Sequence, residues 1–196
     1  NKMTVQQVYL DHTVIAPESL QINDQLHRYL MYDAILNNDA RVDDGKVIGD
    51  PTESALLEMV RKCGVDDDFF RGAMERRQEL PFDSERKLMS TVYALHGVPT
   101  LLTKGAPDVL LERAVYLREK QGIRRMTEKD RAEILEQNQR FSGEGLRVLA
   151  FAYRELKEGE KLTLSGEYDY IFLGLVAMID PPRAESAAAV ADAKRA

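Results

Sequence analysis

Hydrophobic and polar positions along this chain follow two periods, one typical of strands and one typical of helices. Stretches that alternate, or are rich in β-branched and aromatic residues, predict strands over residues 3–10, 87–95, 98–104, 146–154 and 170–178. The last stretch is almost wholly apolar, which predicts a strand in the centre of a sheet. His96-Gly97 supplies a turn between the second and third stretches, so that these two strands pair antiparallel.

A helical period or a capping pattern marks most of the remaining chain. It predicts helices over residues 20–36, 51–63, 67–74, 107–114 and 127–142, and a further alanine-rich helix after Arg183. Asp44-Gly45 predicts a short hairpin over residues 41–48. Helices and antiparallel strands mix here without a regular strand–helix repeat. The expected fold class is therefore α+β, an antiparallel β-sheet with helices packed against it.

Composition limits the function classes without naming one. The 196 residues, 44% hydrophobic and 31% charged, are typical of a globular protein of one large or two small domains. A net charge of -6 argues against a general nucleic-acid binder but not against a site for a small nucleotide. The single Cys63 cannot form an internal disulfide, and the three histidines lack metal-ligand spacing, so no metal site is expected. No apolar run approaches the ~20 residues of a membrane span.

Two short segments on either side of the predicted strand pair carry the candidate chemistry. They are Phe82-Asp83-Ser84-Glu85-Arg86-Lys87 and Thr103-Lys104-Gly105-Ala106-Pro107. Each places a lysine beside a residue suited to a flat, anionic ligand, and the strand pair can bring both lysines to one surface. This indicates a purine nucleotide site, although the chain has neither a P-loop nor a dinucleotide-binding glycine motif.

Each candidate residue also has a structural interpretation. Phe82 can stack on adenine, which is worth roughly 1–3 kcal/mol, or fill the core at a strand end. Lys87 and Lys104 can meet phosphates or be solvated strand residues. Gly105 allows a ligand to approach the backbone closely, or simply forms a strand-to-helix corner.

Glu53 and Arg147 have similar alternatives. Glu53 can accept a hydrogen bond from the adenine amine, but it also stands at the third position of a helix opened by Asp50 and Pro51. On residue chemistry alone the capping role is favoured. Arg147 follows a Gly-x-Gly break and can reach a phosphate or ribose, or pair with a surface acid.

Six segments, taken together and in order, resemble the nucleotide-binding domain of P-type cation-transporting ATPases, most closely the calcium-pump-like branch. They cover residues 1–5, 49–56, 82–90, 104–107, 145–150 and 173–183. The resemblance implies a nucleotide-binding domain over 1–180, followed over 181–196 by a hinge into the phosphorylation domain. It also implies that the chain is an excised piece of a longer protein, since the family's Asp-Lys-Thr-Gly-Thr motif lies just upstream of the segment similar to residues 1–5.

The resemblance also implies roles at positions that match the family's motifs. Phe82 matches the adenine-stacking phenylalanine, and Glu53 matches the acid near the adenine amine. Arg147 matches the arginine that reaches toward the phosphates. Lys87 and Lys104 match the nucleotide-site lysines.

The pocket wall and one phosphate contact complete this comparison. Gly105 and Ala106 match residues of the pocket wall. Some animal calcium pumps carry an arginine where this chain has Ser84. Arg86 lies on the same face as Ser84 if strand alternation holds, and is the candidate to replace that arginine.

These features lead to one functional expectation and two alternatives. The domain is expected to hold ATP by its adenine and to present the γ-phosphate to an aspartate of a separate domain, with Mg²⁺ bound in the full-length pump. No residue of the chain is expected to be catalytic, so the fragment should bind ATP or ADP without hydrolysis. The expected partners are the phosphorylation and actuator domains of the same polypeptide. The chain is expected to be a cytoplasmic domain of a membrane protein that lies in a bacterial plasma membrane. The alternatives are a non-catalytic protein-interaction module and a self-contained nucleotide hydrolase.

Overall fold

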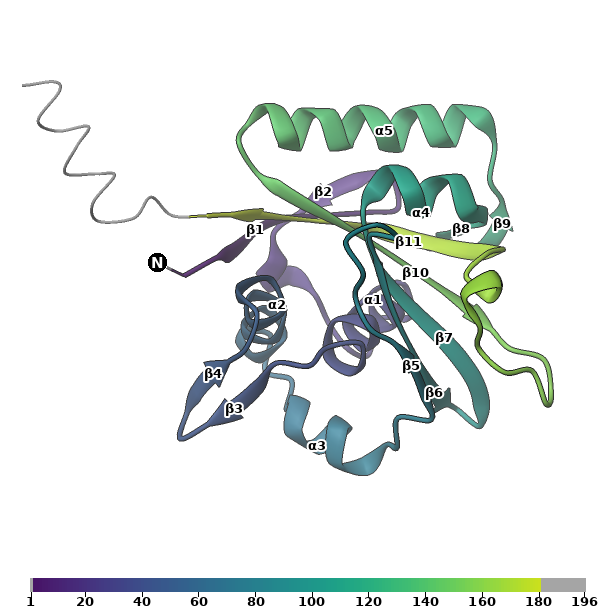
Figure 1. Ribbon diagram of the computed structural model, residues 1–196. Helices are drawn as coiled ribbons and strands as arrows, with labels where there is room; N and C mark the ends of the chain where they lie inside the picture. The colour runs from purple at the N-terminus through teal and green to yellow at the C-terminus, as the bar shows by residue number, and fades with distance from the viewer. Residues whose placement is uncertain (1, 181–196) are drawn as a thin grey trace, which may run out of the picture.

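The computed structural model describes residues 2–180, which form one large sheet covered by helices (Figure 1). Its strands are β1 Thr4–Leu10, β2 Thr13–Ile15, β3 Arg41–Asp43, β4 Lys46–Ile48, β5 Gln78–Leu80, β6 Leu88–Leu95, β7 Val98–Gly105, β8 Ala114–Glu119, β9 Gly122–Arg125, β10 Arg147–Glu155 and β11 Tyr170–Ile179. Its helices are α1 Gln25–Leu36, α2 Pro51–Lys62, α3 Asp67–Ala73, α4 Pro107–Arg113 and α5 Glu128–Gly143. The predicted hinge over 181–196, with its helix, lies outside the described residues.

The large sheet has the strand order β2-β1-β11-β10-β7-β6-β5. Every pair along this path is antiparallel, whereas β8 pairs with the first residues of β11 in parallel. β11 lies inside the sheet and is buried along almost its whole length, as its apolar sequence predicts. The α+β expectation is confirmed.

Helices cover both faces of this sheet and create two hydrophobic cores. In Figure 1, α4 and α5 lie on one side of the sheet, and α1, α2 and α3 lie on the other. Neighbouring residues of one strand serve different cores: Phe151 of β10 packs with α1, while Ala150 and Ala152 pack with α4 and α5. This arrangement places the start of α2 beside the end of β7 and the start of β10. Among the described residues, no helix is both long and apolar enough to cross a membrane.

Four of the five predicted helices have bounds within one residue of those observed, and two features differ more. The helix expected from residue 20 begins at Gln25, because the Asp24 side chain accepts a hydrogen bond from the Leu26 amide and caps it there. The helix expected over 107–114 ends at Arg113, and the chain then forms the β8–β9 hairpin, which was not predicted. β8 exists because β11 offers it a pairing edge, and that edge is set by residues far along the chain.

The turn after β1 holds an ion cluster that should make stability depend on pH. His12 Nε2 lies 2.7 Å from Glu119 Oε2, and its Nδ1 lies 2.8 Å from Glu133 Oε1. Burial disfavours charge on the imidazole, but the hydrogen bonds to Glu119 and Glu133 outweigh burial and raise the pKa of His12. The cluster therefore joins the β1–β2 turn to β8 and α5 in the protonated state.

We expect His12→Gln to lower the free energy of unfolding by up to about 1 kcal/mol at pH 5.5, a small value because the cluster is partly solvated. A raised folded pKa contributes stability fully below the unfolded pKa of about 6.5 and loses it as pH rises through the folded value. The difference between the two proteins should thus shrink toward pH 9. Urea unfolding across this range checks it, and a difference that grows with pH would contradict it.

Candidate functional site

A cavity of about 330 Å³ opens between the start of α2, the segment before β6, the end of β7 and the start of β10. Its lining comprises Asp50, Thr52, Glu53, Phe82, Met89, Lys104, Gly105, Arg147 and Leu149. Pockets for small ligands start at about 300 Å³, so the space suits a base and sugar better than a whole nucleoside triphosphate. Of the seven predicted site residues, the structure brings five to this cavity, all except Lys87 and Ala106.

Phe82 presents its ring to solvent at the cavity rim. Its exposed fraction is 61%, which rules out the core interpretation of this residue. The same cavity is lined by the buried Met89 and the half-buried Leu149. An exposed aromatic ring beside a partly apolar hollow is suited to stacking with a flat heterocycle.

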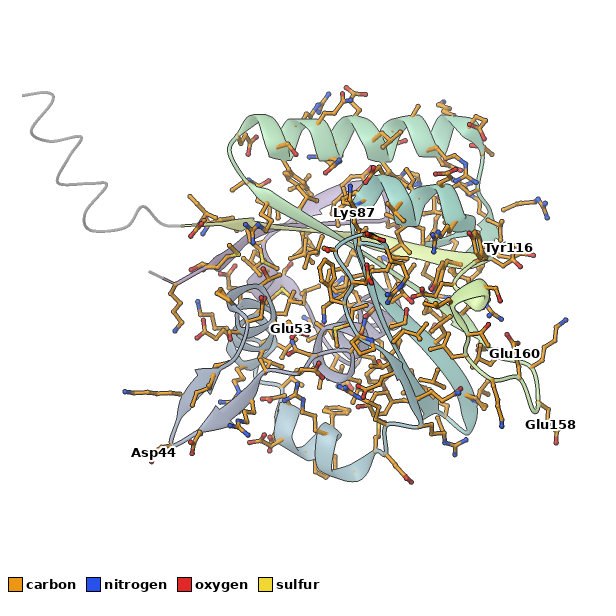
Figure 2. All side chains as sticks on the ribbon, in the orientation of Figure 1. Asp44, Glu53, Lys87, Tyr116, Glu158 and Glu160 are labelled. Carbon is orange, nitrogen blue, oxygen red and sulfur yellow. The ribbon has the colours of Figure 1, made fainter. Side chains whose placement is uncertain are left out.

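The segment after Phe82 is a tight turn and not the start of a strand. Asp83 Oδ1 accepts hydrogen bonds from the Glu85 amide at 2.7 Å and the Arg86 amide at 3.0 Å, and these bonds lower the pKa of Asp83. Lys87 then adopts a φ of 64°, and β6 begins only at Leu88. The prediction of Lys87 as a strand residue is therefore wrong. Its exposed side chain stands at the turn before β6, whereas Glu53 lies at the start of α2 (Figure 2).

Gly105 is required by the close approach of this turn to the end of β7. A Cβ at Gly105 would lie 2.1 Å from the Lys87 carbonyl oxygen. The next amide, of Ala106, donates a hydrogen bond to the same oxygen at 3.1 Å. Ala106 thus contacts the turn through its backbone, at the N-cap of α4, without lining the cavity.

Lys104 and Glu53 form a buried ion pair in the cavity wall. Lys104 Nζ lies 2.8 Å from Glu53 Oε2 and also donates to the Asn37 carbonyl, and the residue is only 5% exposed. The interpretation of Lys104 as a solvated strand residue is therefore wrong. Glu53 stands at the predicted third position of α2, behind the N-cap Asp50, but its carboxylate accepts from Lys104 and from the Asp39 amide at 3.1 Å. It joins α2 to the residues after α1.

Asp33 is a second acid near Lys104 that sequence reasoning missed. It is fully buried on α1, and its Oδ1 accepts a hydrogen bond from Asn37 Nδ2 at 3.0 Å. Burial raises the pKa of Asp33 well above its usual range, against the opposing effects of the Asn37 hydrogen bond and the Lys104 charge. Glu53 is therefore the acid that contacts and balances Lys104. A polar pair spaced i, i+4 at the end of an apolar helix was the signal available in the sequence.

The two arginines near the site have different environments. Arg147 is exposed at the start of β10, and its Nη1 lies 3.5 Å from Thr52 Oγ1, the outer limit of a hydrogen bond. Arg86 instead pairs with the buried Glu167. Residues 84–86 form a turn, so the strand alternation that would have placed Arg86 on the face of Ser84 does not exist here.

Comparisons with known proteins identify the family of this chain. A family model described as "P-type ATPase, cytoplasmic domain N" matches residues 27–185. Calcium-transporting ATPases of Bacillus cereus, Listeria monocytogenes and Lactococcus lactis are each 40% identical to the chain over its whole length. The chain covers 22%, 23% and 22% of these relatives, about a fifth of their length. The chain belongs to the family of cytoplasmic N domains of P-type ATPases.

Proposed function

We propose that this domain binds ATP by its adenine base and leaves the γ-phosphate outside the cavity. The observation that carries the proposal is Phe82, which is 61% exposed at the rim of a cavity of about 330 Å³. Membership of the N-domain family supports nucleotide binding in general. The interaction-module alternative required Phe82 to be buried, so the exposed ring argues against it.

The charges around the cavity favour one orientation of the nucleotide. Adenine stacks on Phe82 near Met89, and its exocyclic amine donates to a free lone pair of Glu53. Lys104 holds that carboxylate in place through the 2.8 Å contact. Of the exposed cations, Arg147 lines the cavity, so the phosphates leave past it toward solvent, whereas Lys87 does not line the cavity.

The reaction then belongs to a larger protein. Phosphoryl transfer depends mainly on positioning and electrostatic stabilisation, and this domain contributes the positioning. The acceptor is an aspartate of a separate phosphorylation domain, and Mg²⁺ accompanies the phosphates there. Three relatives are named calcium-transporting ATPases, and all three are bacterial proteins, so we propose calcium as the transported ion and a bacterial plasma membrane as the location.

A titration of the ¹⁵N-labelled domain with ATP tests the proposal. We expect a Kd of about 0.1–10 mM, roughly 3–5.5 kcal/mol, because most contacts with the triphosphate lie outside this domain. Amide shifts should be largest around Phe82, Lys104 and Gly105, and no phosphate should be released. Shifts confined to residues far from the cavity, or none at millimolar ATP, would contradict the proposal. Steady phosphate release that Lys104→Ala abolishes would favour a self-contained hydrolase instead.

A further inference from the structure

We propose that Arg86 and Glu167 are positioning residues for Phe82: their buried ion pair fixes the segment from which the ring projects. The proposal rests on the proposed function, because it concerns the ring that meets adenine. It gives a role to Arg86, which the phosphate interpretation leaves without one. It also gives a role to Glu167, at the end of the polar loop that precedes β11.

The pair lies inside the protein, unlike the ring it serves. Glu167 has an exposed fraction of 0%, and the Arg86 side chain is 13% exposed. Arg86 Nε lies 2.6 Å from Glu167 Oε1. The N–H does not point along a hydrogen-bond direction, so the contact is one between charges. The other oxygen, Oε2, accepts a hydrogen bond from Ser90 Oγ at 2.5 Å.

Arg86 connects this acid to the backbone immediately before Phe82. Its Nη2 donates to the Pro81 carbonyl at 3.0 Å and to the Leu80 carbonyl at 3.2 Å. One planar guanidinium therefore contacts the acid through Nε and two consecutive carbonyls through Nη2. A lysine keeps the charge but concentrates its donors on one nitrogen, so it does not reproduce the separate positions of Nε and Nη2.

The acid end of this chain of contacts is itself anchored in the sheet. Ser90 Oγ lies 2.7 Å from Thr103 Oγ1, which lies 2.7 Å from the Tyr170 hydroxyl. These residues belong to β6, β7 and β11. The Glu167 carbonyl also accepts from Arg113 Nη1 at 3.3 Å. These contacts connect the Pro81 backbone to the central strands of the sheet, even though the turn that follows is exposed.

A fixed Phe82 segment is useful at a stacking site, and a buried ion pair is suited to fixing it. A buried ion pair is weak evidence for net stability, because desolvation of both charges offsets their attraction. Its contribution to geometry is clearer here, since the other hydrogen bonds of this turn, those of Asp83 and the one from the Ala106 amide to the Lys87 carbonyl, all involve residues after Phe82. A ring held in the stacking orientation before the ligand arrives loses less entropy on binding.

Two variants and a matched control test the proposal by ATP titration and thermal unfolding. Glu167→Gln removes the charge at nearly constant shape, and Arg86→Lys keeps the charge but not the fork of donors. The control is Asp67→Asn, which alters another ion pair with a buried acid, Asp67 Oδ1 to Arg61 Nε at 2.6 Å. Neither Asp67 nor Arg61 lines the nucleotide cavity. All three variants should lower Tm.

We expect Glu167→Gln and Arg86→Lys to weaken ATP binding by about 2- to 10-fold, and Asp67→Asn to leave it unchanged. In a Phe82→Ala background, Glu167→Gln should cause no further loss of affinity, because no ring remains to be positioned. Wild-type affinity in folded Glu167→Gln and Arg86→Lys would overturn the proposal, and so would an equal further loss in the Phe82→Ala background. Failure of the wild-type domain itself to bind ATP would instead overturn the proposed function.

Discussion

Replacing Phe82 with alanine should weaken ATP binding by about 5- to 150-fold, the equivalent of the roughly 1–3 kcal/mol that stacking on a base contributes. The fold should survive, because a ring that is 61% exposed contributes little to the core. Isothermal titration or NMR gives the affinity, and thermal unfolding gives the stability. The expected combination is lost binding with a Tm close to that of the unaltered domain.

Phe69 provides a matched control for this variant. It is 66% exposed, and it lies on α3 and not at the cavity. Phe69→Ala removes the same side chain from a similarly exposed position, so it should leave ATP affinity unchanged. Equal affinity of the Phe82→Ala and unaltered domains would argue against stacking, and global unfolding of Phe82→Ala would return Phe82 to a structural role.

Replacing Gly105 with alanine should have the largest effect on the fold itself. The added Cβ would lie 2.1 Å from the Lys87 carbonyl oxygen and 2.8 Å from a methyl carbon of Leu88. The obstacle is backbone, so β7 and the turn must separate. We expect about 1–3 kcal/mol of destabilisation, at ~2–4 °C of Tm per kcal/mol for a domain of this size, and a loss of the ATP response.

Gly72 provides the comparison for Gly105. It lies within α3 and has no atom within 4 Å of an added Cβ. Gly72→Ala should leave Tm unchanged or raise it, since alanine is favoured over glycine within helices. A Gly105→Ala domain with the Tm and ATP affinity of the unaltered domain would show that the turn does not need the close approach.

The sequence predicted most of the sheet and the helices because their signals are local. The apolar run of β11 and the capping pattern of α5 both correspond to the observed elements. The start of α1 was predicted wrongly because the Asp24 cap sets it. The strands β8 and β9 were missed because β8 forms by pairing with the distant strand β11. Such features require knowledge of the assembled sheet.

The candidate site shows the same division. The segment order placed Phe82 and Gly105 at one cavity, since a strand pair joins them. The burial of Lys104 was not foreseen, because its partners Glu53 and Asn37 come from α2 and from the end of α1. The left-handed φ of Lys87 was missed for another reason: the Asx turn of Asp83 displaced the start of β6 by one residue.

The most direct test of the central claim is a search for intermolecular nuclear Overhauser effects in the complex with ATP. If adenine stacks in this cavity, its H2 and H8 protons should show contacts to the Phe82 ring and to the Met89 methyl group. Contacts to the Lys104 side chain from the same base are expected at the cavity wall. Contacts of the base only with residues elsewhere on the domain, while ATP is demonstrably bound, would contradict the account.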